Sequence, residues 1–357
     1  MTDQPANQDT QAIQDKTKID MVAFAREATI REQVSTYAGS IKIIAPAKVN
    51  LYLGIGNKRA DGYHDVVNIM HALMLHDVLY MRTRQQMEFL VGPDAGLVGN
   101  DEASVDNQAL QVRLVCVGCE GVEVPAIAPE ENLVHKAIMA LGAKTGKGTG
   151  QVIEVRLEKH IPAQAGLGGG SSDAAAALVG AAQLWGLDPA DPAITEVAQS
   201  LGADVPFFLK GGCARFVGKG EQFDQKLSPA KNALVLIKPQ AGLSTAAVYQ
   251  AFDQQGQLPP DKVQADAFAA ASAADVPLFN NLNDPARALL PEIDQIFAWT
   301  AQQPAIADTL LCGSGSTVAA FCTSFEEACR LSAAAMAEGW WTRTTSLANL
   351  RCAVVPK

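Results

Sequence analysis

Apolar residues recur along the chain at spacings that predict a mixture of strands and helices. Short alternating or continuous apolar runs predict strands at 41–44, 49–55, 66–81 (one or two strands), 152–157, 205–217, 233–237, 309–311 and 317–322. Longer stretches, one of them rich in alanine, predict helices at 132–141, 174–185, 193–201, 245–252, 285–302 and 325–337. The two kinds of element interleave without a strict β-α-β rhythm, so the pattern predicts an α+β fold.

Changes in composition along the 357 residues predict a tail and two domains. Residues 1–38 are polar, lack an apolar leader and are predicted to form a mobile tail. Residues 39–228 are predicted to form one domain and residues 229–357 a second. Within the first domain, residues 92–131 are rich in Gly, Asp, Glu and Pro, which is typical of a variable insertion with short strands.

A glycine-rich loop stands between the strand at 152–157 and the alanine-rich helix. The loop consists of Pro162, Ala163, Gln164, Ala165, Gly166, Leu167, Gly168, Gly169, Gly170, Ser171 and Ser172. A turn that opens a helix leaves backbone N–H groups unpaired at the positive end of the helix dipole. Glycines let a ligand approach that backbone closely, and serine hydroxyls can bind phosphate or a phosphate-bound Mg²⁺. The loop is therefore a candidate site for a nucleotide triphosphate.

Other interpretations of this loop are weaker. A flexible Gly/Ser linker rarely leads directly into an alanine-rich helix, although a tight turn remains an alternative. The loop is not a Walker A motif, because no Lys-Ser or Lys-Thr follows the glycines. It also lacks the G-x-G-x-x-G spacing of a dinucleotide-binding turn.

Three further stretches place polar side chains among apolar ones. Lys48 and Asn50 lie two apart in a predicted strand and therefore share one face, unless Lys48 is merely an exposed edge residue. Tyr63 and His64 lie in a polar turn that could stack on a flat ring or could simply be a capped turn. Asp204 follows Gly-Ala and precedes Val-Pro-Phe-Phe, where a carboxylate needs a partner, a cleft or an N-cap role.

Composition excludes several classes of function. Hydrophobic residues make up 48% and charged residues 18% of the chain, no apolar run reaches membrane-span length, and the net charge is −10. The acidic charge argues against a nucleic-acid partner. The seven cysteines are scattered, and Cys116-x-x-Cys119 has no second ligand pair, so no metal site is predicted. An odd number of thiols without a signal peptide favours the cytoplasm.

The ordered set of motifs resembles the GHMP kinase superfamily, which includes galactokinase, homoserine kinase and mevalonate kinase. The resemblance covers about residues 40 to 355 by motif order. It is carried by the motifs at 47–51 (Ala-Lys-Val-Asn-Leu), 162–174, 202–206 (Gly-Ala-Asp-Val-Pro) and 313–316 (Gly-Ser-Gly-Ser). The Gly-Leu-Gly-Gly-Gly-Ser-Ser form of the loop, together with Arg-Ala-Asp-Gly-Tyr-His at 59–64, is most similar to one member, which phosphorylates a cytidylyl sugar alcohol.

This resemblance implies a two-domain fold: an N-terminal domain like domain 2 of ribosomal protein S5, which binds ATP, and a ferredoxin-like C-terminal domain. The active site would lie between them, with Lys48 and Asp204 as the catalytic pair and the loop at 162–172 around the triphosphate of ATP with Mg²⁺. Substrate-binding positions carried over from the family are Asn50, Tyr63, His64, Thr245 and Tyr249. Asp173 departs from the family, which often has Asn at that position.

The function implied is ATP-dependent phosphorylation of the 2-hydroxyl of the cytidylyl sugar alcohol, in non-mevalonate isoprenoid precursor synthesis. Two alternatives remain: a kinase of the homoserine or mevalonate type, and a catalytically inactive nucleotide sensor. The presence of both Lys48 and Asp204 speaks against the sensor, because sensing requires the loop but no base. The expected partner is a small-molecule substrate, with no nucleic acid and no membrane, and the oligomeric state is left open.

Overall fold

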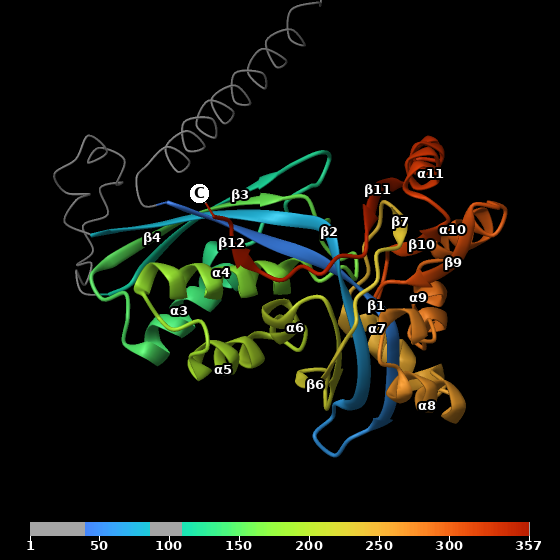
Figure 1. The fold of residues 1–357 in the computed structure, drawn as a ribbon, viewed down its shortest axis with the longest axis horizontal. Helices are drawn as coiled ribbons and strands as arrows, with labels where there is room; N and C mark the ends of the chain where they lie inside the picture. Colours follow the sequence, from blue (N-terminus) through green and yellow to red (C-terminus); the bar gives the residue numbers. More distant parts are fainter. Residues whose placement is uncertain (1–39, 86–108, 357) are drawn as a thin grey trace, which may run out of the picture.

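The computed structural model describes residues 40–85 and 109–356, arranged around two sheets (Figure 1). The larger sheet runs in the order β12-β1-β2-β4-β3, with β5 and β8 pairing to β2 and β1, and β6 pairing to β5. Its strands are β1 (Ile41–Lys58), β2 (His64–Gln85), β3 (Gln111–Gly118), β4 (Gln151–Lys159), β5 (Cys213–Val217), β6 (Gln222–Leu227), β8 (Phe279–Asn280) and β12 (Ala353–Val354).

The smaller sheet has four antiparallel strands in the order β11-β7-β10-β9. They are β7 (Ala233–Lys238), β9 (Ile306–Leu311), β10 (Val318–Cys322) and β11 (Trp341–Ser346). Helices separate β7 from β9 and β10 from β11, which gives the β-α-β-β-α-β connection of a ferredoxin-like fold. The predicted α+β class and the ferredoxin-like C-terminal domain are confirmed.

Helices cover the two sheets separately. Figure 1 shows α3 to α6 together against the large sheet and α9 to α11 beside the small one. The helices are α3 (Leu133–Thr145), α4 (Gly169–Trp185), α5 (Pro192–Leu201), α6 (Val205–Lys210), α7 (Thr245–Gln255), α8 (Asp261–Ala269), α9 (Asn283–Leu289), α10 (Glu292–Thr300) and α11 (Phe325–Ala337). Two short 3₁₀ helices, η1 (Pro129–Glu131) and η2 (Ala273–Asp275), complete the set that the described residues form.

Helix α4 is the central helix of the layer that covers the larger sheet. Its alanines at 174–177 are fully buried, and the helix contacts both β1 and β2. Side chains this small let the helix axis lie close to the sheet, and Gly180 extends the close contact, because a Cβ there would come within 2.4 Å of the Met81 sulfur. The helix ends at Gly186 in the left-handed conformation, as a C-cap glycine does.

Four predicted elements differ from the structure. The strands expected at 41–44 and 49–55 are one strand, β1, because the small buried residues between them stay extended and a register shift after Pro46 absorbs the proline. The strand expected at 205–217 is the helix α6 followed by β5, since Pro206 suits a first helical turn and Gly211 ends it. The helix expected at 285–302 is split into α9 and α10 near Pro291.

The second half of the chain contributes to both sheets. Strand β8 pairs parallel to β1, and β12 pairs antiparallel to β1, so two short strands from 229–357 extend the large sheet. Because these strands join the sheet of the first half, the pairing does not mark where one domain ends. The predicted boundary between residues 228 and 229 stays a prediction. The predicted tail at 1–38 and the part of the predicted insertion at 92–108 lie outside the described residues.

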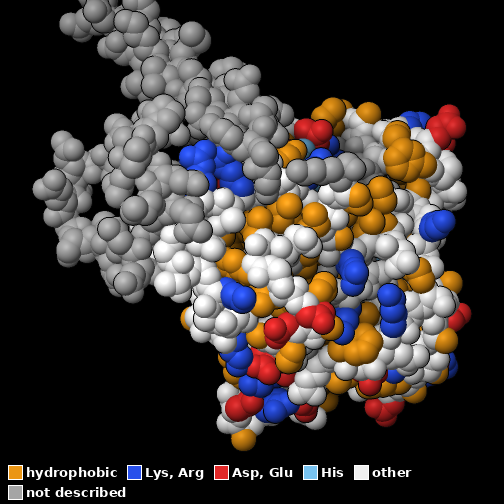
Figure 2. All heavy atoms as spheres, turned by 60° about the vertical axis from the view of Figure 1, so that its left-hand side comes forward, with side chains coloured by type: hydrophobic (Ala, Val, Ile, Leu, Met, Phe, Trp, Pro, Cys, Tyr) orange, Lys and Arg blue, Asp and Glu red, His pale blue; other side chains and the backbone are white. Residues whose placement is uncertain are grey.

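One face of the described residues is mixed in character. Acidic, basic and apolar side chains are interspersed on the face shown in Figure 2. Among the described helices, none is both long enough and apolar enough to cross a membrane.

Leu178 tests how closely α4 packs, because its side chain is fully buried among the helices and strands of the first layer. Leu178→Ala should lower the free energy of unfolding by about 2–5 kcal/mol, since the lost transfer energy is joined by the energy of the cavity left behind. Urea denaturation measures this. Gln183→Ala, on the exposed side of the same helix, should stay within about 0.5 kcal/mol of the wild type, and an equal loss would contradict the packing described.

Candidate active site

A cavity of about 690 Å³ lies where the glycine-rich loop meets β1, the start of α6 and the turn after β9. Every loop residue from Pro162 to Ser171 lines it. Lys48, Asn50, Asp204, Thr245 and Tyr249 line it as well. The structure thus brings together most of the predicted site, although these residues come from distant parts of the chain.

The loop approaches its neighbours so closely that two of its glycines cannot carry a side chain. A Cβ at Gly166 would lie 1.8 Å from the backbone oxygen of Cys312, and one at Gly168 would lie 2.7 Å from the Phe208 ring. Both glycines have a φ of +73°, which also favours glycine. Helix α4 begins directly after Gly168, so its first N–H groups lack intrahelical acceptors while the residues that carry them line the cavity.

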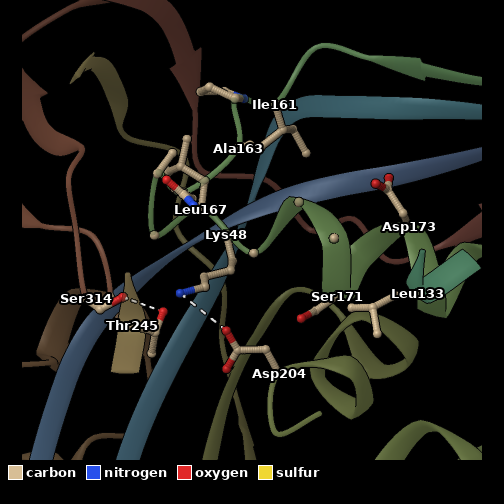
Figure 3. Close-up of a pocket in the computed structure, with 18 of the residues that line it drawn as sticks. Lys48, Leu133, Ile161, Ala163, Leu167, Ser171, Asp173, Asp204, Thr245 and Ser314 are labelled. Atoms are coloured by element: carbon tan, nitrogen blue, oxygen red, sulfur yellow. Dashed lines mark hydrogen bonds and ion pairs between the residues drawn. The ribbon is translucent and has the colours of Figure 1, made fainter. Parts of the chain in front are cut away.

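Lys48 lies at the centre of the polar end of the cavity (Figure 3). Its side chain is 3% exposed, and its Nζ lies 3.5 Å from an Asp204 carboxylate oxygen and donates a 2.6 Å hydrogen bond to Asn50 Oδ1. Asn50 in turn donates to Asn68 Oδ1 on β2 at 2.9 Å. These contacts fix the direction of the ammonium, so Lys48 is not the exposed edge residue that the sequence also allowed.

Asp204 occupies the N-cap position of α6, yet its side chain makes no capping hydrogen bond. Its carboxylate is 29% exposed and faces Lys48 instead. The N-cap alternative is therefore wrong for the side chain. The carboxylate is left within reach of a ligand in the cavity.

The two residues of α7 that were predicted to bind substrate, Thr245 and Tyr249, also line the cavity. Thr245 Oγ1 and Ser314 Oγ are 2.9 Å apart, which links α7 to the Gly-Ser-Gly-Ser turn at 313–316 (Figure 3). Burial, with a contribution from the Asp204 charge, raises the pKa of Tyr249, so its phenol is neutral at neutral pH. The hydroxyls of Thr245, Ser314 and Tyr249 are thus neutral hydrogen-bonding groups at the polar end of the cavity.

Tyr63 and His64 lie beside the cavity and do not line it. Tyr63 is 58% exposed, and Lys219, which does line the cavity, lies with its Nζ 4.1 Å from the Tyr63 ring centroid. His64 is nearly buried, with its ring nitrogens 3.0 Å from Gly56 O and 2.8 Å from Asp253 Oδ1. Its ring centroid lies 6.1 Å from that of Tyr249. The two residues therefore lie next to the polar end of the cavity, in contact with Lys219 and Tyr249, which line it.

Ser172 is the one predicted loop residue that turns away from the cavity. Its side chain is fully buried, and its Oγ lies 3.7 Å from the Cys352 sulfur. The neighbouring Ser171 does line the cavity and lies toward its interior (Figure 3). Of the two serine hydroxyls, the structure leaves Ser171 available to a ligand.

The opposite end of the cavity is apolar and was not predicted from the sequence. Leu133 and Ile161 lie on that side of the loop (Figure 3), together with Val124, Ile127 and Leu157. Part of this wall comes from the segment that looked like a variable insertion, where no motif signals a binding role. Lys159 also lines this end, and it too was missed.

Comparison with known proteins agrees with this geometry. Residues 132–212 match the model of the GHMP kinases N terminal domain. A relative from Pelotomaculum thermopropionicum, a 4-diphosphocytidyl-2-C-methyl-D-erythritol kinase, is 36% identical over 299 residues, covering 82% of this chain and 93% of the relative. A Nocardia farcinica protein of the same name is 34% identical over 309 residues, covering 84% of this chain and 91% of the relative.

Solved structures show the same fold. A 4-(cytidine 5'-diphospho)-2C-methyl-D-erythritol kinase, 27% identical, matches with a TM-score of 0.64 over 86% of this chain and 99% of that one. Homoserine kinase from Cytophaga hutchinsonii, 19% identical, matches with a TM-score of 0.61 over 90% and 98%. The chain has the two-domain GHMP fold and belongs to the GHMP kinase superfamily, within the family of 4-diphosphocytidyl-2-C-methyl-D-erythritol kinases.

Proposed function

We propose that this kinase transfers the γ-phosphoryl group of ATP to the 2-hydroxyl of 4-diphosphocytidyl-2-C-methyl-D-erythritol, a step of non-mevalonate isoprenoid precursor synthesis. The observation that carries the proposal is the Lys48–Asp204 pair, 3.5 Å apart, in the same cavity as the glycine-rich loop. Phosphoryl transfer requires positioning and charge neutralisation more than covalent chemistry. The glycine-rich loop positions the phosphate donor, ATP. The Lys48–Asp204 pair supplies a base for the acceptor hydroxyl and a positive charge for the phosphoryl group.

The triphosphate of ATP is placed at the start of α4. Residues 166–171 line the cavity at the positive end of the helix dipole of α4, which favours a polyanion. The adenine is placed at the apolar end, where Leu133, Ile127 and Val124 offer surfaces for a flat ring. This arrangement directs the γ-phosphate toward Lys48 and Asp204.

Mg²⁺ fits this site as a companion of the nucleotide. Among the described residues, no three His, Cys, Asp or Glu side chains converge as a metal site. Mg²⁺ in kinases binds chiefly to substrate phosphates with few protein ligands, and the Ser171 hydroxyl in the cavity is a suitable oxygen ligand. When bound, the ion neutralises charge on the phosphates.

The alcohol is placed at the polar end. Asp204 accepts the proton of the 2-hydroxyl as its oxygen attacks the γ-phosphorus. Lys48, held by Asn50 and Asp204, offsets negative charge on the transferring phosphoryl group. The hydroxyls of Thr245 and Ser314 lie at the same end and can orient the sugar alcohol.

The cytosine ring is placed near Tyr249 and Tyr63, as aromatic surfaces suit a flat base. Tyr249 lines the cavity and Tyr63 is exposed, with Lys219 between Tyr63 and the cavity. His64, held by Asp253, lies against Tyr249. These neighbours support a cytidine site that Tyr63 completes from the hairpin between β1 and β2.

The alternatives have less support. Likeness to homoserine and mevalonate kinases, at 19% and 14% identity, concerns the fold alone. A nucleotide sensor would not require the paired Lys48 and Asp204. Coupled ADP-release assays with a panel of alcohols test the proposal: turnover is expected with the cytidylyl substrate, and turnover with homoserine or mevalonate instead would contradict it.

The cytoplasm is the proposed compartment.

Asp204→Asn should lower kcat on the order of 10²-fold or more, because an amide cannot accept the proton of the attacking hydroxyl. ATP binding should stay near the wild-type value, since the donor loop is untouched. Steady-state kinetics and calorimetric ATP titration measure the two effects. Asp284→Asn is the matched control, because that carboxylate is 87% exposed and does not line the cavity. Full activity of Asp204→Asn would remove Asp204 from the mechanism.

Tyr63→Ala should raise KM for the cytidylyl substrate about tenfold and leave KM for ATP unchanged, because one stacking surface for the base is lost. Phe325→Ala removes an aromatic ring of similar exposure, 56%, from α11 and should change neither constant. A rise in KM for ATP alone would show that Tyr63 belongs to the nucleotide end.

A further inference from the structure

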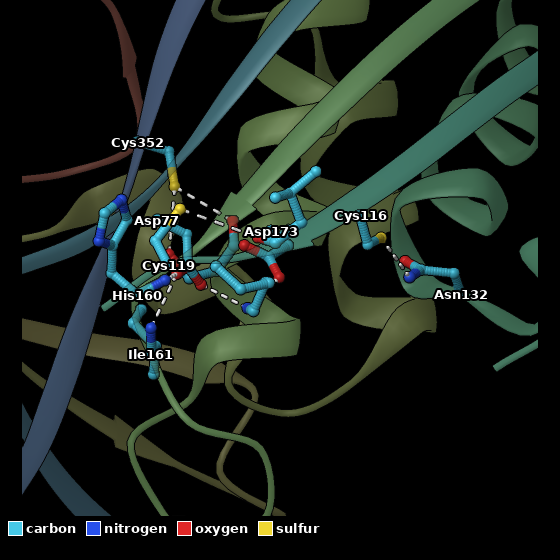
Figure 4. Close-up of polar contacts among 11 residues, drawn as sticks. Asp77, Cys116, Cys119, Asn132, His160, Ile161, Asp173 and Cys352 are labelled. Carbon is cyan, nitrogen blue, oxygen red and sulfur yellow. Dashed lines mark hydrogen bonds and ion pairs between the residues drawn. The ribbon is translucent and has the colours of Figure 1, made fainter. Parts of the chain in front are cut away.

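Lys159 forms a buried ionic cluster with Asp77 and Asp173 next to the glycine-rich loop. Figure 4 labels the two carboxylates. Lys159 ends β4 immediately before the loop, and Asp173 lies on α4 immediately after it. Lys159 Nζ donates a 2.6 Å hydrogen bond to Asp173 Oδ2 and also forms an ion pair with Asp77 of β2. One ammonium therefore connects the two ends of the loop to the large sheet.

Asp77 connects this cluster to strand β2 of the large sheet. Its side chain is fully buried, and besides Lys159 it accepts hydrogen bonds from the backbone N–H groups of His160 and Ile161. These are the first two residues of the segment that leads into the loop. Asp77 does not line the ATP cavity, so it can reach a bound nucleotide only through the residues it holds.

The cluster opposes the conformational freedom of the loop. Glycine loses more backbone entropy on ordering than any other residue, so a segment with four glycines costs more to fix than an ordinary turn. A Cβ at Gly169 would lie 3.3 Å from Lys159 Nζ, which places the ammonium against the first turn of α4. Fixing residues 159 and 173 to one strand therefore restricts where the helix can begin.

The charges of the cluster are tightly coupled. Burial lowers the pKa of Lys159, but the charges of Asp173 and Asp77 outweigh it and raise that pKa above its usual range. Burial also raises the pKa of Asp173, although the Lys159 ammonium opposes that shift. Asp173 Oδ1 is buried and has no hydrogen-bond partner among the described residues. Burying such a cluster is a poor way to gain stability, because desolvation offsets most of the attraction.

We propose that Asp77 and Asp173, acting through Lys159, are positioning residues that hold the glycine-rich loop in its ATP-binding conformation. This inference rests on the proposed function, because it assigns the cluster a role in binding the phosphate donor. Loop amides that are already in place bind a triphosphate without the entropy loss of ordering the segment. The cluster lies on the ATP side of the cavity, so its contribution concerns the nucleotide and not the alcohol.

Asp77→Asn is the sharpest test, because the amide keeps an oxygen for the His160 and Ile161 N–H groups but loses the ion pair with Lys159. KM for ATP should rise about tenfold or more, while KM for the alcohol stays within about twofold of wild type. Hydrogen exchange of the amides at 163–172 should become faster, measured without ligand. Asp173→Ala, which removes the second carboxyl group that Lys159 Nζ contacts, should act in the same direction and decides the matter if Asp77→Asn does not fold.

Glu154→Gln is the matched control. Glu154 lies on β4 and pairs with Arg82 on β2, so the change weakens an ion pair between the same two strands away from the loop. It should leave KM for ATP and loop exchange unchanged. Wild-type ATP affinity and wild-type loop exchange in a folded Asp77→Asn would overturn the inference. If the wild type itself does not bind ATP, the proposed function fails, and faster loop exchange in Asp77→Asn still supports the anchor.

Discussion

The close contact between the glycine-rich loop and the turn that follows β9 is the constraint on which the site depends. The backbone of Gly166 fits against Cys312 O only because it has no Cβ. The N–H of Thr317 donates to Ala165 O, and the N–H of Lys48 donates to Leu167 O, so the loop is bonded on both sides. The glycine-rich loop therefore sets the distance between Lys48 and the smaller sheet. The cavity is formed by this contact rather than by the shape of either sheet alone.

The same loop is flanked by two ammonium groups that are each held by carboxylates. Lys48 pairs with Asp204 at the polar end, and Lys159 pairs with Asp77 and Asp173 at the apolar end. The chain has a net charge of −10, so a triphosphate site needs local positive groups near the N–H groups of the loop. Pairing keeps both ammoniums in fixed directions, so little reorganisation is needed when phosphate enters.

The sequence predicted the local parts of this site and missed those that depend on distant contacts. Strand periodicity placed Lys48 and Asn50 on one face, and the Gly-to-Ala transition located the start of α4 within a few residues. The helix at 205–210 was mistaken for a strand because its short apolar run has no helical period to detect. No sequence motif pointed to Asp77 or to the apolar wall of the cavity. The role of Asp77 depends on its ion pair with Lys159, which is distant in sequence and is visible only in the folded structure.

Asp204 shows how the fold gives up local stability to the site. An aspartate at an N-cap position ordinarily accepts a backbone hydrogen bond that stabilises a helix by about 0.5–2 kcal/mol. Here the carboxylate makes no such bond and faces Lys48 across the cavity, at the start of a helix of only six residues. The phenylalanines of α6 compensate, because Phe207 and Phe208 are fully buried and fix the helix from its core side. Hydrophobic anchoring behind the helix thus leaves the carboxylate facing Lys48 and open to the cavity.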